Sequence, residues 1–175
     1  NIVELIPNRS VFLKTTNDGN FSQTDFVQAS ASLNTWTHFA VKLKNGTLTL
    51  IRDGVVVASK SGYNGNVEWS GFNEPLMYLG SFSSDAGGGT NYFDGKMDEV
   101  RFWNVARSDN EIKAYRNVGL SGNEEGLIGY WRLDEDSGTS VVDSSLNNNN
   151  GNISGGANWE LGESEFFFQE DLLDP

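Results

Sequence analysis

Polar and apolar residues alternate with a period of two along much of the first third of the chain, and this period is typical of β-strands. In residues 36–44, three apolar side chains share one face and the residues between them share the other: Phe39, Val41 and Leu43 against His38, Ala40 and Lys42. The pairs Asn45-Gly46 and Asp53-Gly54 follow, and such pairs accept the positive φ of type I′ hairpin turns. The pattern predicts a three-stranded antiparallel meander over residues 36–58.

Shorter strands are predicted farther along the chain, at residues 76–80, 96–104 and 126–133. Between the last two, Ser108 and Glu111 have the spacing of a capping box, in which each side chain binds a backbone N–H at the start of a helix. We expect this helix to be short and to be the one helix of any length. Many strands, glycine-rich turns and one short helix predict an all-β fold, a β-sandwich of antiparallel sheets.

The length and composition suit this class. The chain has 175 residues, enough for one domain with a real core, and its 20 glycines and 3 prolines suit many tight turns. We predict a sandwich domain at residues 1–160 and an acidic edge strand or linker at residues 161–175. The chain begins with Asn and carries no signal peptide, so we expect it to be a piece of a longer protein.

The charge and the missing residue types exclude several functions. The net charge is −12, which argues against binding to nucleic acid or to an anionic membrane surface, because phosphate groups need a positive partner. No apolar run approaches the ~20 residues of a membrane span, so we expect no membrane insertion. The chain has no cysteine and a single histidine, His38, which we expect to be structural. An acidic surface favours cations, and calcium in particular binds to carboxylate and carbonyl oxygens.

Several segments, taken in order, resemble laminin G and pentraxin-like domains. They are WTHFAV at 36–41, LTLIRDGV at 48–55, YLG at 78–80, FDGKMDEVRFWN at 93–104 and SDNEI at 108–112. A second set resembles the strand and loop at module edges of bacterial members: GYWRLDE at 129–135, DSS at 143–145 and NGN at 150–152. These domains belong to the concanavalin A-like lectin and glucanase superfamily, and the resemblance covers roughly residues 30–160.

The resemblance implies a jelly-roll β-sandwich of two antiparallel sheets in an extracellular or cell-surface protein. It also implies a glycan or polysaccharide as the ligand class and calcium as the cofactor. The family normally opens with a strand pair and an A-L-x-F-D-G sequence well before the segment at 36–41, and this opening is absent here. Either the opening lies on another chain, or residues 126–159 close the sandwich in its place.

Asp98 and Glu99 stand side by side in the predicted strand 96–104 and raise the question of a glycoside hydrolase. Adjacent strand residues point to opposite faces, so these two carboxylates could not flank one glycosidic bond. Glycosidases need two carboxyl groups about 5 Å apart, or about 6.5–9.5 Å apart, according to mechanism. The Glu-x-Asp-x-x-Glu strand of the glucanase branch is also missing. We therefore predict a scaffold strand with no catalytic residue, in which Glu99 pairs weakly with Arg101 across water.

The glycine-rich loop at residues 81–91 is the first candidate for calcium. In pentraxin-like relatives the matching loop supplies calcium ligands, and here the ligands would be Asp85 and Asn91. Calcium takes about six to eight oxygen ligands, and this loop offers only one carboxylate. The alternative is a plain surface loop.

The segments 134–138 and 143–147 are the second candidate, because acids and amides cluster in both. Asp134 and Asp143 would be the ligands if the two loops fold back on each other. The alternative is a set of Asx turns and internal hydrogen bonds. The asparagine run at 147–150 reads most simply as a solvated turn.

Sugar binding needs a flat aromatic face with polar side chains at its rim. Four aromatic residues in or beside loops are the predicted platform: Tyr63, Trp69, Phe72 and Tyr92. Three tryptophans in predicted strands are expected in the core: Trp36, Trp103 and Trp131.

Three functional hypotheses remain. The leading one is a non-catalytic, calcium-assisted, carbohydrate-binding or adhesion module. The second is a structural or assembly module that packs against other domains or chains of the same surface assembly, because an incomplete sandwich would expose unpaired strand edges. A glycoside hydrolase is the remote third.

Overall fold

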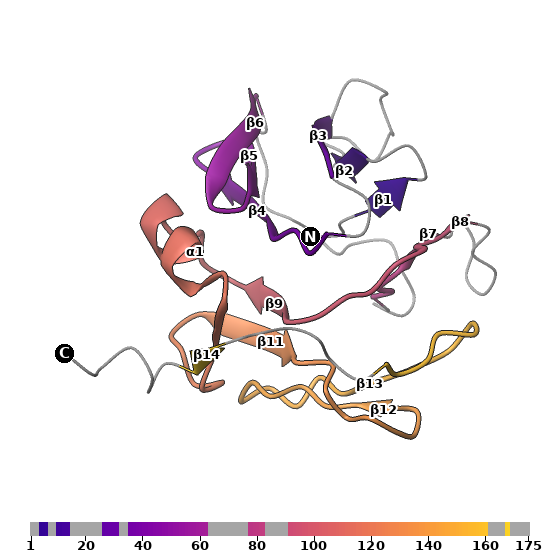
Figure 1. The fold of residues 1–175 in the computed structure, drawn as a ribbon. Helices are drawn as coiled ribbons and strands as arrows, with labels where there is room; N and C mark the ends of the chain where they lie inside the picture. The colour runs from indigo at the N-terminus through magenta and orange to yellow at the C-terminus, as the bar shows by residue number, and fades with distance from the viewer. Residues whose placement is uncertain are drawn as a thin grey trace. The chain divides into compact units, whose positions relative to one another are not determined.

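A computed structural model of the chain gives the fold (Figure 1). The structure describes residues 4–6, 10–14, 26–31, 35–62, 77–82, 91–160 and 167–168. The chain divides into two compact units, Asn1–Gly95 and Lys96–Pro175.

The first unit contains two three-stranded antiparallel sheets. One sheet consists of β1 (Glu4–Ile6), β2 (Ser10–Lys14) and β3 (Phe26–Ser30), and the other of β4 (Phe39–Lys44), β5 (Thr47–Arg52) and β6 (Val55–Ser61). The second sheet is the predicted meander, and its last strand continues to Ser61, past the predicted end at Ala58.

Both hairpin turns of the meander have the predicted conformation. Asn45 and Gly46 have φ angles of 49° and 69°, and Asp53 and Gly54 have φ angles of 52° and 78°. The Oδ1 atom of Asp53 accepts a hydrogen bond from the His38 N–H at 3.0 Å, and the Asp53 N–H donates to the His38 carbonyl at 2.9 Å. The second turn therefore also fixes the chain that leads into β4.

The two sheets of the first unit meet through apolar side chains. Val27 and Ala29 of β3 form one buried cluster with Leu48 and Leu50 of β5. Five partly buried residues pack against this cluster: Phe39, Val41, Leu43, Val57 and Ala58. The first three are those that the alternation placed on one face of the predicted strand. The predicted core face of β4 is confirmed, and sheets that pack face to face in this way make a sandwich.

A short antiparallel pair, β7 (Ser81–Phe82) and β8 (Asn91–Tyr92), completes the described part of this unit. The strand predicted at 76–80 is wrong for residues 77–80, which belong to no strand and of which Leu79 and Gly80 form a bend. The reason is Gly80, whose φ of 77° turns the chain just before β7. Residue 76 and the loop residues 83–90 lie outside the described residues.

The described residues of the second unit form three strand pairs and one helix. The pairs are β9 (Val100–Trp103) with β11 (Leu127–Trp131), β12 (Ser140–Val141) with β13 (Gly151–Asn152), and the parallel pair β10 (Val118–Gly119) with β14 (Phe167–Phe168). The helix α1 (Asp109–Tyr115) begins with the predicted capping box of Ser108 and Glu111. The predicted strand at 126–133 is confirmed for residues 127–131.

The strand predicted at 96–104 begins only at Val100, so the prediction is wrong at its start. Glu99 has a φ of 54°, a left-handed conformation that is uncommon outside glycine. Asp98 and Glu99 therefore precede β9 and do not alternate within it. The left-handed backbone turns the Glu99 side chain toward partners that a regular strand would not give it.

The three tryptophans expected in the core differ from one another. Trp131 is buried and packs edge to face on Phe102, with ring centroids 5.8 Å apart. Trp103 is partly buried under the Arg107 guanidinium, 4.4 Å from the ring centroid. Trp36 is 49% exposed, and the prediction is wrong there because β4 begins three positions later, at Phe39.

The described residues contain no helix with the length and apolar character needed to cross a membrane.

Gly122 offers a test of the close approach between two loops of the second unit. It has a φ of 91°, and a Cβ atom there would lie 2.0 Å from the Ser144 carbonyl oxygen. Gly122→Ala should lower the free energy of unfolding by about 3 kcal/mol or more, because backbone would have to move. Gly138 has a similar φ of 81° with nothing within 4 Å, so Gly138→Ala should cost only about 1–2 kcal/mol. Urea denaturation measures both losses, and equal losses would contradict this account.

Candidate functional site

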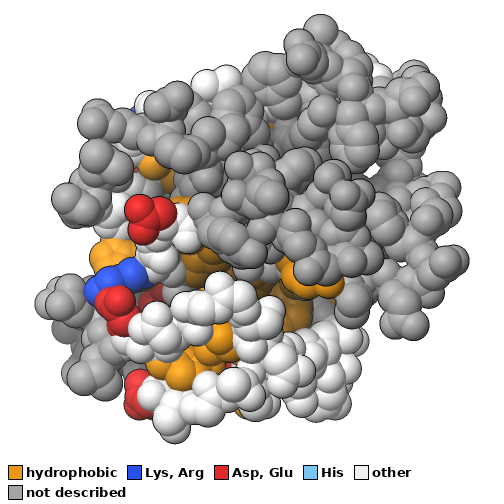
Figure 2. Space-filling view, turned by 90° about the vertical axis from the view of Figure 1, so that its right-hand side faces the viewer, with side chains coloured by type: hydrophobic (Ala, Val, Ile, Leu, Met, Phe, Trp, Pro, Cys, Tyr) orange, Lys and Arg blue, Asp and Glu red, His pale blue; other side chains and the backbone are white. Residues whose placement is uncertain are grey.

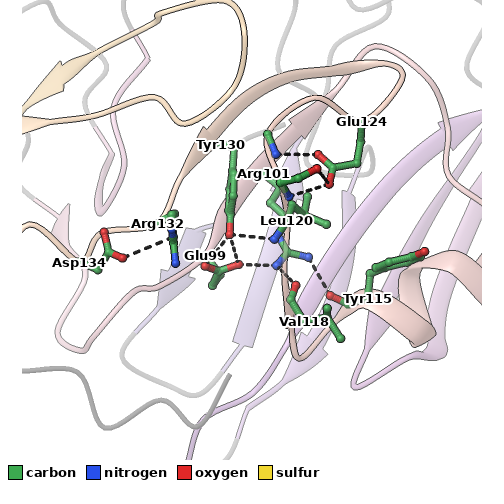
Figure 3. A network of polar contacts seen from close by, with 11 residues as sticks. Glu99, Arg101, Tyr115, Val118, Leu120, Glu124, Tyr130, Arg132 and Asp134 are labelled. Atoms are coloured by element: carbon green, nitrogen blue, oxygen red, sulfur yellow. Dashed lines mark hydrogen bonds and ion pairs between the residues drawn. The ribbon is translucent and has the colours of Figure 1, made fainter. Parts of the chain in front are cut away.

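A cluster of polar groups in the second unit joins the start of β9 to β11 and to the chain after α1 (Figure 3). Its centre consists of Glu99, Arg101 and Tyr130. All three lie in the segments that resemble the laminin G and pentraxin-like family. The geometry of this cluster decides whether the carboxylate of Glu99 is available for chemistry.

The Arg101 guanidinium is enclosed by partners. Its Nη1 atom donates to the Tyr115 carbonyl at 2.7 Å, and its Nη2 atom donates to the Val118 carbonyl at 2.5 Å and to Glu99. The guanidinium carbon lies 5.4 Å from the centroid of the Tyr130 ring. The side chains of Arg101 and Glu99 are 13% and 10% exposed, so their ion pair is largely out of water.

Tyr130 completes the cluster through its hydroxyl. The hydroxyl donates to the Glu99 carboxylate, with oxygens at 2.7 and 2.8 Å, and accepts from the Leu120 N–H at 3.2 Å. Burial raises the pKa of Tyr130 to about 12, although the Leu120 N–H bond acts in the opposite direction. The Glu99 carboxylate reinforces the upward shift of this pKa, and the Arg101 charge opposes it. Tyr130 is therefore a neutral hydrogen-bond donor at ordinary pH.

This arrangement suits an anchor better than an acid–base pair. Among the described residues, the groups that hold the oxygens of Glu99 are a guanidinium and a phenol. A glycosidase would need a second carboxyl group across the substrate. The predicted weak, solvent-exposed pair of Glu99 and Arg101 is wrong, because the left-handed backbone at Glu99 brings the carboxylate under Tyr130. The i, i+2 spacing of the two charges predicted the pair but not its burial.

Asp143 is the centre of a second network, and it is buried with 4% of its surface exposed. Its Oδ1 atom accepts from the N–H groups of Tyr130 and Ser145 at 2.8 and 2.9 Å. Its Oδ2 atom accepts from the Ser145 hydroxyl at 2.9 Å and from the Asn149 N–H at 2.8 Å. Burial raises the pKa of Asp143, but these donors outweigh burial and hold the pKa below its usual range. The carboxylate is an ionised structural anchor.

Asp134 has different surroundings. It is exposed and lies 3.4 Å from the Nε atom of Arg132, an ion pair that contributes little in water. The adjacent Glu135 accepts from the Val142 N–H at 2.6 Å, so the two loops predicted to fold back on each other do so. The contact is made through Glu135, which the sequence analysis did not single out.

Calcium at these loops stays a prediction. A calcium ion at Asp143 would have to displace a donor, because the carboxylate already accepts four hydrogen bonds. Within the described ranges, no group of three or more acidic, histidine or cysteine side chains is placed to hold a metal ion.

The asparagine run is more than a solvated turn. The side-chain amides of Asn147 and Asn149 donate to backbone carbonyls of β11, and Asn150 accepts from the Asp143 N–H at 2.8 Å. The prediction missed these roles because the partners lie about 20 residues earlier in the chain, and their proximity is a property of the fold.

The predicted ligand residues of the first unit fall largely outside the described residues. Tyr63, Trp69, Phe72 and Asp85 are not among those residues. For Asn91 and Tyr92 the structure describes the backbone, as β8. These assignments stay predictions.

One protein-family model matches the chain, over residues 4–113. It is a laminin G-type model of the concanavalin A-like lectin/glucanases superfamily. The chain belongs to this superfamily. The match confirms the family suggested by the motifs and begins earlier in the chain than they do. It also confirms the fold class, since the superfamily has a jelly-roll β-sandwich and the structure consists mostly of antiparallel strands with one short described helix.

Among solved structures, the chain is similar to a candidate carbohydrate-binding protein from Bacteroides ovatus, with a TM-score of 0.60 and 24% identity over 83% of this chain. The chain spans 40% of the length of that protein chain. It is also similar to an S-layer domain-containing protein from Clostridium thermocellum, with a TM-score of 0.42 and 22% identity over 61% of this chain and 51% of that chain. The comparison with curated proteins gives no match. These likenesses concern the fold, and a fold of this kind hosts both lectins and enzymes.

Asp143→Asn tests the buried carboxylate. The substitution replaces an acceptor oxygen by an amide that faces N–H donors, so the free energy of unfolding should fall by about 2–4 kcal/mol at neutral pH. The folded-state pKa is lowered, so this stabilisation is present above the unfolded pKa and is lost as the pH falls through the folded value. Urea titrations should show the difference between wild type and variant shrinking below about pH 4.

The exposed Asp134 provides the control. Asp134→Asn should change the free energy of unfolding by less than about 0.5 kcal/mol. A difference for Asp143→Asn that stayed constant down to the lowest pH measured would refute the role given to its charge.

Tyr130→Phe tests the cluster of Glu99, Arg101 and Tyr130 at alkaline pH. Loss of the hydroxyl removes one donor from Glu99, which keeps Arg101, and removes the acceptor of the Leu120 N–H. The free energy of unfolding should fall by about 1–3 kcal/mol. The folded pKa of about 12 exceeds the unfolded value, so the hydroxyl stabilises fully below pH 10 and its contribution is lost between pH 10 and about pH 12. The difference from wild type should shrink over that range by at most about 1.4 kcal/mol per pH unit.

Tyr78 is exposed, and Tyr78→Phe is the matched control that should show neither effect. If Tyr130→Phe behaved like this control, the hydroxyl would have no structural role.

Proposed function

We propose that the chain is part of a non-catalytic binding or adhesion module that recognises a glycan or polysaccharide with the help of calcium. It acts at the cell surface or outside the cell, within a larger surface or secreted protein. Membership of a lectin and glucanase superfamily supports carbohydrate as the ligand class.

The observation that supports a non-catalytic function is the bonding of the Glu99 carboxylate to other side chains of the protein. The carboxylate in the family-like segment is held by Arg101 and Tyr130, in a largely buried site. A group that must protonate or attack a sugar needs access to the substrate and a partner carboxylate. Glu99 has its oxygens engaged by structural donors instead.

The proposed sugar platform belongs to the first unit. Its aromatic residues are Tyr63, Trp69, Phe72 and Tyr92, and the exposed indole of Trp36 is a further aromatic surface in the same unit. Loops presented by a rigid sandwich are common places for recognition. The net charge of −12 favours a neutral or cationic ligand over an anionic one.

For calcium, the loop with Asp85 and Asn91 is the first proposed site and the pair Asp134 and Asp143 the second. The donors around Asp143 make the second site the less favourable of the two. A calcium ion in the first loop would also orient a bound sugar.

The alternative is an assembly module, and the apolar surface favours it. Val55 and Val56 are exposed on β6, which has a described strand partner on one edge only. On the face drawn in Figure 2, orange apolar side chains reach the surface among polar atoms. Exposed apolar groups on an edge strand can bind another protein surface.

A glycan and polysaccharide array, read in calcium and again in chelator, tests the proposal. We expect binding in calcium and at least tenfold weaker binding in chelator, a difference of about 1.4 kcal/mol or more. Asp85→Asn should reproduce the loss in the presence of calcium. Asp136→Asn, which removes an exposed acid from the second unit, is the matched control and should bind like the wild type.

The outcomes separate the hypotheses. Binding that persists in chelator would refute the calcium dependence and would support the proposed glycan binding. No binding in either condition would refute the glycan and favour assembly. Cleavage of any polysaccharide, abolished by Asp98→Asn, would overturn the non-catalytic proposal.

A further inference from the structure

The edge of β11 that faces away from β9 is the starting point. Among the described strands, β9 is the only one that pairs with β11, and a single antiparallel bridge also joins Trp131 of β11 to Asp143. A strand edge without a neighbour exposes a row of N–H and C=O groups that can pair with a strand of another molecule. The question is what occupies these groups here.

Two asparagine side chains occupy the first half of this edge. The Asn147 amide nitrogen lies 3.3 Å from the Leu127 carbonyl oxygen, and the Asn149 amide nitrogen lies 2.9 Å from the Ile128 carbonyl oxygen. Consecutive carbonyls of a regular strand point to opposite edges. Here the register against β9 shifts between Leu127 and Gly129, so that Ile128 is an extra residue and both carbonyls are available to the same loop.

The chain around Asp143 occupies the second half. The Tyr130 N–H donates to the Asp143 carboxylate at 2.8 Å, and the Tyr130 carbonyl accepts from the Ser144 N–H at 2.7 Å. Residues 143–150 thus satisfy four backbone groups of β11, mostly with side chains, in place of a neighbouring strand.

Asn149 is held in position at three points. Its N–H donates to Asp143, its carbonyl accepts from the Trp131 indole N–H at 3.0 Å, and its amide reaches β11. A side chain that is already fixed by its own backbone loses little entropy when it makes a further hydrogen bond. The loop is therefore built to hold this amide against the strand.

The groups near this edge would favour association if it were open. Ile128 is 39% exposed and lies on the strand itself, and Leu146 is 77% exposed within the loop. Apolar side chains beside unpaired backbone groups are a typical feature of strands that associate.

We propose that residues 143–150 form an edge guard that prevents β11 from pairing with a strand of a second copy of this chain. The guard is independent of the proposed sugar platform and of the first proposed calcium site, and it shares Asp143 with the second. It gives the asparagine run at 147–150 a function, because an asparagine amide is short, uncharged and able to donate to a carbonyl as a neighbouring backbone N–H would.

The double variant Asn147→Ala/Asn149→Ala tests the guard. It removes both amides and leaves Asp143 and its donors in place. Sedimentation velocity over a range of protein concentrations, at about 0.15 M salt so that the net charge of −12 is screened, measures association. We expect self-association at concentrations at least tenfold lower than those at which the wild type associates.

Two controls separate an open edge from a weakened fold. Asn148→Gly changes the same loop at an exposed residue whose φ of 55° suits glycine, and it should behave like the wild type. Gly138→Ala lowers stability without changing a residue of the guard and should not cause association. Association of Gly138→Ala to the same extent as the double variant would overturn the proposal, because loss of stability would then suffice.

A double variant with the wild-type concentration dependence would also overturn it. If the double variant does not fold, as judged by far-ultraviolet circular dichroism, the single variant Asn149→Ala takes its place. It removes the shorter of the two bonds, and the same outcomes apply.

Discussion

The buried carboxylate of Asp143 is the constraint on which the second unit depends. A charge that leaves water must be surrounded by hydrogen-bond donors, because a buried charge without them is strongly unfavourable. The donors come from β11, from Ser145 and from the asparagine run. The hydrogen bonds that this one carboxylate accepts therefore fix the path of residues 143–150 and hold this segment along β11. The edge guard is a consequence of the same set of bonds.

Tyr130 connects this network to the second one. Its backbone N–H binds Asp143, and its hydroxyl binds the Glu99 carboxylate and the Leu120 N–H. Arg101 extends the contacts to the carbonyls of Tyr115 and Val118. Charged and polar groups that leave water together in this way are stable only if every partner is present, so the two networks should lose stability together. The segment that identifies the family is thus a structural joint of the second unit.

The structural roles of these carboxylates bear on the function of the chain. A superfamily that contains lectins and glucanases supplies a sandwich, and the ligand is chosen by groups added to it. Glu99 and Asp143 of the second unit are engaged in holding strands and loops. The chain spans 40% of the length of the Bacteroides ovatus relative.

The sequence by itself determined the local elements. The Asn45-Gly46 and Asp53-Gly54 turns, the apolar face of β4 and the capping box of α1 all follow from neighbouring residues, and the structure confirms each of them. The motifs also gave the family. The tertiary structure decided the rest: the left-handed backbone of Glu99, the burial of its pair with Arg101, the exposure of Trp36 and the bonds of the asparagine run. The physical reason is sequence separation. A turn or a cap depends on residues a few positions apart, whereas Glu99 meets a phenol 31 positions later and Asn149 a carbonyl 21 positions earlier. Only the folded chain brings such partners together.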